Sequence, residues 1–598
     1  MLKKFFLCAA VLLDLSAPGL SAAEQEFNPA GWETNSNYPA IGSPEAKKGG
    51  TFRSYWPGFP RTLRALGPDS DLAAIREVQG LVYEPLVNLH PGTLEYMPGL
   101  ADYWKLSGDK RKFYFHLNPK ARWADGTPVT AEDIVATWDF RARADIKDPS
   151  SLSLWVENFE RPAAESREIV SVRTKKLHWR LFLDFGGMSI YPAKELKGLT
   201  GEKYLEDYNW KMPMGSGPYE LKAEGIKKER SVTLTRRGDY WAEAEWRNTG
   251  LNNFDRLSWE AVPDEKPAFE KFKKGELDYY RVASARSWFE DCDFDKIQKG
   301  WILKRRIFNE APRDFSGFAL NMRKPPFDDD NVRKAFAYLL DREKLIDKFF
   351  SREYDLLDSY FPGGGWENPW NPKIRYNPLL AQRLLERAGW ITRNKDGWLV
   401  KNGKIFELAF EYGDPGMAGI YKVLREDAEK AGIKLNLKQT DPAALLKKVG
   451  ERDFALYFQS REALLFPDPA SAWTAELADT LNTGNLTGFK SQEVDALCEK
   501  YGAAFDREER KRIIREIDGI IFGGHPYALA WSSNSSRILY YNKFGHPKEY
   551  FSRTGGDGDM KTLWWIDPEA EKALEDAMAG DIGLPAGETV QKPWQKRL

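Results

Sequence analysis

Alternating hydrophobic and polar residues mark a predicted strand in the first third of the chain, and a helical pattern follows it. The stretch KFYFHL, residues 112–117, alternates and ends at Asn118-Pro119, which predicts a strand closed by a turn. After the turn dipeptide Asp125-Gly126, apolar residues recur every four positions from Ile134 to Ala142, which predicts a helix with one buried face. The pattern therefore indicates a strand, a turn and a helix in succession.

The acidic residues of 121–140 have predicted structural roles in this unit. Thr130 stands three residues before Asp133, a variant of the capping box, in which two side chains bind the first amides of a helix. Glu132 and Asp133 fall in the first helical turn, where the helix dipole favours negative charge. We therefore interpret this run as a scaffold and not as a catalytic pair; Asp139 is the acid for which the pattern gives no local role.

A second stretch predicts a strand-helix-strand unit. Asn377 and Pro378 predict the start of a helix that ends at Gly389. Beyond it, residues 404–413 predict a strand, residues 417–433 a helix and residues 434–440 another strand. Helices that cover a sheet in this way predict an α/β fold.

The N-terminus has the pattern of an export signal. Lys3 and Lys4 precede an apolar run from Phe5 to Leu13, and Ser21-Ala22-Ala23 supplies the small residues that a signal peptidase prefers. The apolar run is too short to span a bilayer, and no later run is long enough. We expect an exported protein that is cleaved near Ala23 and is not inserted in the membrane.

Composition sets wider limits on fold and partners. A chain of 598 residues is too long for one hydrophobic core, so several lobes are expected. The 88 Lys and Arg residues are balanced by 89 Asp and Glu residues, so the chain has no basic excess for nucleic acid. The 22 Trp residues suit aromatic-lined clefts.

No sequence motif for catalysis, metal binding or cofactor binding is present. The chain lacks the GxSxG, HExxH, P-loop and GxGxxG patterns, and its five histidines show no ligand spacing. We therefore predict no catalytic residues, no metal and no cofactor. Paired carboxylates of a glycoside hydrolase remain an alternative, because acids are abundant. Cys292 and Cys498 are interpreted as buried thiols, although a disulfide between them stays open.

The stretch LADYWKLSGDKRKFYFHLNPKARWADGTPVTAEDIVATWDF, residues 100–140, resembles the signature of the family 5 extracellular solute-binding proteins, the oligopeptide- and dipeptide-binding receptors of ABC importers. Other stretches resemble the same family in the same order: PEAKKGGTF (44–52), MGSGPYEL (214–221), LNMRKPPFDDDNVRKAFAYLLDREKLI (320–346), YNPLLAQRLLERAGW (376–390) and NLTGFKSQEVDAL (485–497). The first of these, together with the chain length, resembles the YejA-like branch.

The resemblance implies an α/β, two-lobed periplasmic-binding-protein fold (type II, cluster C) with a third, smaller inserted domain. The implied organisation is a signal peptide at 1–23, lobe I at 24–75, 213–314 and 536–598, the small inserted domain at 76–212, and lobe III at 315–535. Two chain crossings, near 314 and 535, would form a hinge, and the lobes would close on a ligand bound between them.

The resemblance also implies a function and partners. The protein is expected to be a periplasmic substrate-binding protein that captures oligopeptides or similar solutes and delivers them to an ABC permease with its ATPase subunits. It is expected to be a monomer and not an enzyme. The alternative is an exported carbohydrate-binding receptor or glycoside hydrolase that uses Trp platforms.

The family's amine-binding Asp lies in a segment that resembles DFALYFQSREALLFPDPASAW, residues 453–473. Counting forward from the strand matches it to Glu462, whereas counting back from Pro469 matches it to Leu465. A buried ammonium needs a partner, so we expect Glu462 or Asp468 to bind the ligand's amine and Arg461 to bind its carboxylate. The residues expected to line the wall are Tyr457, Phe458 and Gln459.

The resemblance implies two further ligand contacts, at positions that match those of the family. Asp69 of the segment GPDSD, residues 67–71, is expected to contact the ligand from lobe I. Trp155 is expected to reach in from the small domain, although plain core packing is an equal alternative for a Trp.

Overall fold

The computed structural model describes residues 27–70 and 73–594. The predicted signal peptide, residues 1–23, lies outside the described residues, as does Asp71 of the 67–71 segment.

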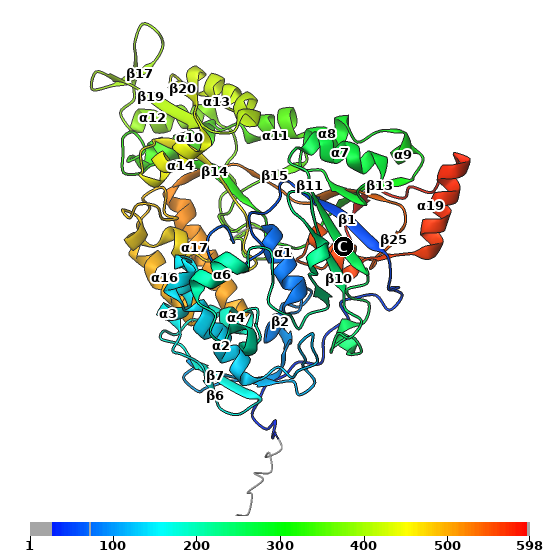
Figure 1. Ribbon diagram of the computed structural model, residues 1–598. Coiled ribbons are helices and arrows are strands. Elements are labelled where there is room, and N and C mark those ends of the chain that lie inside the picture. Colours follow the sequence, from blue (N-terminus) through cyan, green and yellow to red (C-terminus); the bar gives the residue numbers. More distant parts are fainter. Residues whose placement is uncertain (1–26, 71–72, 595–598) are drawn as a thin grey trace, which may run out of the picture.

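Lobe I is built on two sheets whose strands come from distant parts of the chain (Figure 1, right). Its first sheet has the order β1 (Thr51–Trp56), β11 (Arg256–Ala261), β10 (Ser231–Arg236) and β8 (Tyr219–Glu220), with β9 (Ile226–Lys227) also on β10. Its second sheet has the order β12 (Tyr279–Arg281), β24 (Ser536–Tyr541), β13 (Ile302–Ile307) and β27 (Val590–Gln591). Helices α7 (Glu265–Lys274), α8 (Ala285–Glu290), α9 (Asp295–Gln298) and α19 (Pro568–Gly580) lie at the outer side of this lobe (Figure 1).

The small domain lies at the bottom of Figure 1 and has its own four-stranded sheet. The sheet order is β4 (Ala101–Leu106), β5 (Lys112–Leu117), β7 (Ile169–Arg173) and β6 (Ala163–Ala164), and a hairpin of β2 (Val87–Leu89) and β3 (Tyr96–Pro98) lies beside it. Its helices include α2 (Ala131–Arg141), α3 (Pro149–Asn158), α4 (Arg180–Gly186), α5 (Ala193–Leu196) and α6 (Gly201–Asp207). Phe113, Phe115 and Trp123 are among its fully buried residues.

The acids of residues 121–140 hold the small domain together, as the pattern predicts. The Thr130 amide donates to Asp133 Oδ2 at 2.8 Å, and the capping box of α2 is complete. Asp133 Oδ1 also accepts from the Ala193 amide at 2.7 Å. Asp139 has a partner that the local pattern did not indicate, because Arg161 donates to both of its oxygens at 2.7 Å. These contacts give Asp133 and Asp139 structural roles.

Lobe III lies at the upper left of Figure 1. Its strands form the sheets β21 (Leu456–Arg461), β14 (Phe315–Leu320), β22 (Tyr527–Leu529); β15 (Tyr354–Leu356), β23 (Trp531–Ser533); β19 (Glu407–Tyr412), β20 (Lys434–Gln439); and β16 (Thr392–Arg393), β17 (Leu399–Lys401), β18 (Lys404–Ile405). Its main helices are α10 (Asp330–Leu339), α11 (Arg342–Phe350), α12 (Pro378–Arg387), α13 (Ala418–Lys430), α14 (Pro442–Gly450), α16 (Gln492–Ala503) and α17 (Arg507–Gly524).

The predicted helix and strand-helix-strand unit of this lobe are confirmed. The Asn377 side chain accepts from the Leu380 amide at 3.0 Å at the start of α12, and Gly389 has φ +87° just after its end. Strands β19 and β20 pair in parallel, and α13 connects them.

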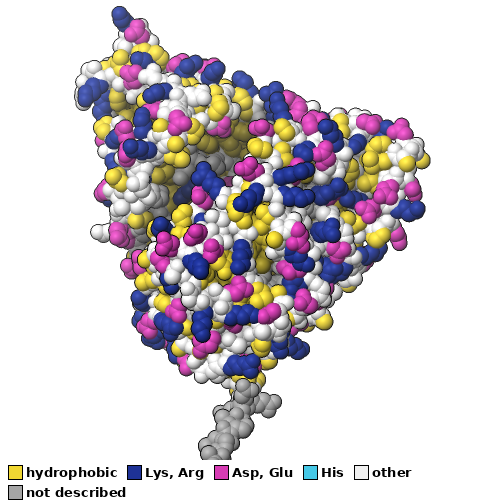
Figure 2. Space-filling view, viewed as in Figure 1, with side chains coloured by type: hydrophobic (Ala, Val, Ile, Leu, Met, Phe, Trp, Pro, Cys, Tyr) yellow, Lys and Arg dark blue, Asp and Glu magenta, His cyan; other side chains and the backbone are white. Residues whose placement is uncertain are grey.

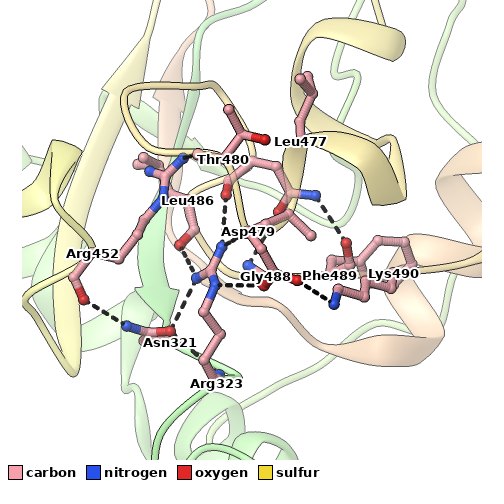
Figure 3. A network of polar contacts seen from close by, with 12 residues as sticks. Asn321, Arg323, Arg452, Leu477, Asp479, Thr480, Leu486, Gly488, Phe489 and Lys490 are labelled. Atoms are coloured by element: carbon pink, nitrogen blue, oxygen red, sulfur yellow. Dashed lines mark hydrogen bonds and ion pairs between the residues drawn. The ribbon is translucent and has the colours of Figure 1, made fainter.

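A guanidinium network joins two of the stretches that resemble the family (Figure 3). Arg323 Nη1 donates to Asn321 Oδ1 at 3.1 Å and to the Leu486 carbonyl at 2.9 Å, and its Nη2 donates to the Ala478 carbonyl. Asn321 Nδ2 in turn donates to the Phe454 carbonyl at 2.8 Å. The network fixes the 474–490 loop to the end of β14.

The chain crosses between the two lobes at two places within the described residues: between β13 and β14, at 308–314, and between β23 and β24, at 534–535. Ion pairs accompany both crossings. Arg306 donates to Glu353 Oε1 at 2.8 Å and to Ser535 Oγ at 2.9 Å. Arg313 donates to Asp355 Oδ2 at 2.7 Å.

The two cysteines within the described residues, Cys292 and Cys498, are buried and unpaired. Cys292 belongs to a core of lobe I and Cys498 to a core of lobe III. Burial raises the pKa of Cys292 to about 11 and that of Cys498 to about 12, so both remain thiols at neutral pH. This agrees with two inert thiols.

Replacing Arg323 with Ala is expected to destabilise lobe III, because the carbonyls of Ala478 and Leu486 would lose a charged donor. The expected loss in the free energy of unfolding is about 3 kcal/mol, measured by urea denaturation. Arg352→Ala is the control, since Arg352 is 81% exposed and pairs only at the surface with Asp347. Equal unfolding midpoints for the two variants would contradict a structural role for the network.

Candidate functional site

A cavity of about 660 Å³ lies between lobe I and lobe III. Figure 2 shows the surface hollowed at the place where the elements at the upper left of Figure 1 face those at the right. The lobe I wall consists of Arg281, Val282, Ala283, Ser536 and Arg537. The lobe III wall comes from α11, β15, β19, α13, α14, β21 and β23, and the crossings contribute Asp314 and Ser535. Its volume lies within the range of about 300–1,000 Å³ that is usual for small-molecule sites.

The wall from lobe III is rich in aromatic rings. The aromatic residues that line it are Phe350, Tyr354, Phe410, Tyr412, Tyr421, Tyr457, Phe458 and Trp531. Several of them brace one another: Phe458 and Trp531 have ring centroids 6.0 Å apart, and Phe410 and Tyr421 are 4.7 Å apart. Leu446, which is 62% exposed, adds an aliphatic surface to this wall.

The two walls of this cavity carry charges of opposite sign. Lobe I supplies two guanidiniums, Arg281 and Arg537, and lobe III supplies two carboxylates, Glu411 and Asp414. Hydrogen bonds from Lys448 and then Thr440 hold the pKa of Glu411 below its ordinary value, so that carboxylate stays ionised. The negative charge of Asp557 raises the pKa of Arg281 further above its ordinary value.

The two guanidiniums are held differently. Arg537 is 5% exposed, and its Nε and Nη2 donate to the carbonyls of Val282 at 3.2 Å and Ala283 at 2.6 Å. These bonds make Arg537 part of the cavity wall. Arg281 forms no hydrogen bond or close ion pair with any other residue of the described chain, so its donors are available to a ligand.

A second cavity, of about 310 Å³, lies in lobe III. Aromatic rings line it too, namely Phe315, Tyr360, Phe361, Trp366 and Trp473. Its charged lining residues are Arg313, Arg461, Glu462 and Asp468. Arg461 places its guanidinium 5.3 Å from the centroid of the Phe315 ring.

The predicted site residues of β21 and of the loop that follows it are divided between the two cavities. Tyr457 and Phe458 line the first cavity, whereas Arg461, Glu462 and Asp468 line the second. Ser460 lines the first cavity and Arg461, the last residue of β21, lines the second, as expected for successive side chains of a strand, although Tyr457 and Phe458 both line the first. Gln459 lines neither cavity, and its Oε1 accepts from the Tyr527 hydroxyl at 2.7 Å.

The structure does not bring the other two predicted site residues to either cavity. Asp69 lies at the surface with φ +63° and pairs with Arg61 at 3.3 Å. Trp155 is 3% exposed and packs against Phe159 and Phe185 in the core of the small domain. The position of Trp155 matches the alternative of plain core packing.

Sequence reasoning missed the lobe I side of the first cavity. One sequence feature could have indicated this side: the polar run SSNSS, residues 532–536, which spans the end of β23, the crossing and the first residue of β24. Residues 411–414 were also missed, although they lie at the end of the strand predicted over 404–413. The Arg281 position had no local signal.

A family model for bacterial extracellular solute-binding proteins, family 5 Middle, matches residues 95–480. The chain belongs to this family. The sequence resemblance is therefore confirmed, and the protein is a substrate-binding receptor of the type that serves ABC importers. Members of the family are exported or periplasmic proteins, in agreement with the predicted export signal.

Individual relatives of this solute-binding protein cover most of its length. A probable peptide-binding protein of Agrobacterium fabrum, YejA, is 25% identical over 595 residues, which are 92% of this chain and 94% of that protein. The oligopeptide-binding protein AppA from Bacillus subtilis, solved with a nonapeptide, has a TM-score of 0.66 and 20% identity, covering 88% of this chain and 100% of its own.

A third likeness is to an oligopeptide-binding protein from Thermotoga maritima with bound mannohexaose. Its TM-score is 0.63 at 19% identity, covering 86% of this chain and 97% of its own. These likenesses confirm the α/β, two-lobed fold of type II.

The described residues also bear on membrane insertion and metal binding. None of their helices has the length and apolar character of a membrane span. No cluster of three or more His, Cys, Asp or Glu suited to a metal ion occurs in residues 27–70 and 73–594.

Replacing Trp155 with Ala tests whether this residue serves the core or the ligand. We expect a loss of about 3–5 kcal/mol in the free energy of unfolding, because a large buried ring is removed. Ligand affinity per folded molecule should stay unchanged in a titration. Trp370→Ala is the control, since Trp370 is 79% exposed and should leave stability unaltered. A selective loss of affinity in Trp155→Ala would place this residue at the ligand instead.

Proposed function

We propose that the protein is a periplasmic receptor that binds oligopeptides between lobe I and lobe III and delivers them to an ABC permease and its ATPase subunits. It acts as a monomer, after removal of the signal peptide near Ala23, and it catalyses no reaction. The domain boundaries that we propose are those stated for the sequence, with the hinge at the crossings near 314 and 535.

The arrangement of charges in the first cavity carries the proposal. Arg281 belongs to lobe I, while Glu411 and Asp414 belong to lobe III, so closure brings opposite charges around one ligand. A peptide is zwitterionic and also offers backbone groups for strand-like hydrogen bonds. A neutral sugar would leave the Arg281 guanidinium without a charged partner in the ligand, which is costly once water is excluded.

The second cavity extends this proposal to the peptide's amine. Glu462 forms no ion pair with the rest of the described chain, and Leu464, 55% exposed, stands beside it in the lining. The aromatic rings of this cavity also favour an ammonium group, because their faces attract cations. We propose Glu462 as the amine's partner, with Asp468 as the second carboxylate and Arg461 near the ligand's carboxylate.

The aromatic wall of the first cavity favours a second candidate, a carbohydrate ligand. Flat rings such as those of Tyr412 and Trp531 suit stacking on sugars. A hydrolase would also need a protonated acid at neutral pH, whereas Lys448 keeps Glu411 ionised. Mass spectrometry of ligands released from protein purified from its own host distinguishes peptides from sugars. Turnover of an oligosaccharide that depends on one carboxylate would favour the hydrolase.

Ligand binding is expected to close the lobes, because a ligand favours whichever arrangement binds it more tightly. Small-angle scattering should record a smaller radius of gyration after addition of a mixture of synthetic tri- to pentapeptides. A mixture of malto-oligosaccharides is the matched control. Demonstrated peptide binding with an unchanged radius would contradict closure about the two crossings.

Glu462→Ala is expected to weaken binding of a free peptide from that mixture by roughly 2–5 kcal/mol, the cost of truncating one partner of a buried charge pair. The N-acetylated form of the same peptide should lose little, because it has no ammonium group. Calorimetry of both peptides measures the difference, and Asp468→Asn tests the second carboxylate. Equal losses for the two peptides would mean that the amine is held elsewhere.

A further inference from the structure

The small domain reaches lobe III through the turn that precedes α4. In Figure 1 this part of the small domain lies against α16 and α17. The contacts join residues 178–180 to residues that are almost 300 positions away in the sequence.

Trp179 anchors the contact. Its side chain is 2% exposed and belongs to a hydrophobic core of lobe III, not to that of its own domain. The Arg510 guanidinium lies 3.9 Å from the centroid of the Trp179 ring, and Phe466 packs edge-on at 5.3 Å. The Trp179 amide also donates to the Gly502 carbonyl at 2.8 Å. The neighbouring Arg180 is therefore held in a fixed place.

Arg180 uses this position to bind a loop of lobe III. Its Nη2 donates to the carbonyls of Phe466 at 3.0 Å and Pro467 at 2.9 Å. We call residues 462–468 the anchor loop, because it carries Glu462 and Asp468. The two carbonyls lie at the end of this loop that leads to Asp468.

Other contacts tie the same loop to the crossing at 308–314 and to the rest of lobe III. The Ala463 amide donates to Asp314 Oδ1 at 3.1 Å, and Trp366 Nε1 donates to the Leu465 carbonyl at 3.2 Å. The Tyr501 hydroxyl donates to the Pro467 carbonyl at 2.7 Å. Arg180 is thus the tether that comes from another domain. Without it, the Phe466 carbonyl loses a charged donor within a packed interface.

We propose that Arg180 is a positioning residue for ligand recognition: by binding two carbonyls of the anchor loop, the small domain sets where Glu462 and Asp468 stand in the second cavity. This inference rests on the proposed function, in which that cavity receives the ligand's amine. A guanidinium is suited to the task because its Nη2 carries two N–H groups in fixed directions, and this nitrogen donates to both carbonyls. A pre-placed carboxylate loses less conformational freedom when the ligand binds.

The test compares Arg180→Ala with Arg507→Ala. Arg507 is a matched control, because it also donates to a carbonyl across the same interface, that of Thr93 at 2.6 Å, but forms no hydrogen bond with the anchor loop. For each protein, calorimetry gives the affinities of a free peptide and of its N-acetylated form, and thermal unfolding gives stability. The ratio of the two affinities reports amine recognition, which a merely structural role would not change.

Arg180→Ala is expected to reduce this ratio about tenfold, which corresponds to one hydrogen-bonded interaction. Arg180→Lys should give an intermediate ratio, because the ammonium keeps the charge but lacks the fixed N–H directions of the guanidinium Nη2. If Arg180→Ala does not fold, Arg180→Lys alone tests the positioning role. Arg507→Ala should lower the melting temperature and leave the ratio within about twofold of the wild type.

The remaining outcomes separate the inference from the function on which it rests. A ratio in Arg180→Ala equal to that in Arg507→Ala would overturn the positioning role while leaving peptide binding intact. Equal affinity of the wild-type protein for both peptides would instead overturn amine recognition in the second cavity, and the positioning role with it.

Discussion

The ion pairs at the two crossings are the interaction on which the arrangement of the lobes depends. Glu353 of lobe III accepts from Arg306 of lobe I at 2.8 Å, while Arg537 of lobe I stands 3.9 Å from its other oxygen. Arg537 Nη1 and Glu353 Oε2 are buried without a hydrogen bond in this arrangement. Buried charges tolerate little separation, so these groups restrict the angles that the lobes adopt. The same ion pairs therefore limit how far the two walls of the first cavity can move apart, because Arg537 lines that cavity.

Rules on caps and on hydrophobic periodicity predicted those parts of the fold that depend on residues close together in the sequence. The capping box at Thr130, the Asn377 cap and the β19–α13–β20 unit depend on residues within one element or two neighbouring ones. The opposite placement of Ser460 and Arg461 also follows from the two-residue period of a strand. The same rule does not account for Tyr457 and Phe458, which are successive residues of β21 and both line the first cavity.

The residues that the sequence placed poorly depend on distant partners. Gln459 is bound to Tyr527, 68 positions away, and Arg180 reaches carbonyls 286 and 287 positions away. Trp155 is apolar enough for a cleft or a core, and only the packing of Phe159 and Phe185 around it decides between them. Arg281 has no local signal, because its importance comes from facing another lobe.

The small domain adds a second constraint to lobe motion. It is joined to lobe I through contacts such as Tyr240 to Glu84 at 2.6 Å, and to lobe III through Trp179. Lobe opening that separates the small domain from lobe III must expose the Trp179 ring, at a cost of about 2–3 kcal/mol in lost apolar burial. A ligand's preference for one lobe arrangement over another is of the same order, a few kcal/mol. The Trp179 contact therefore affects the equilibrium between lobe arrangements by an amount comparable to that of a ligand, although no residue of the small domain lines either cavity.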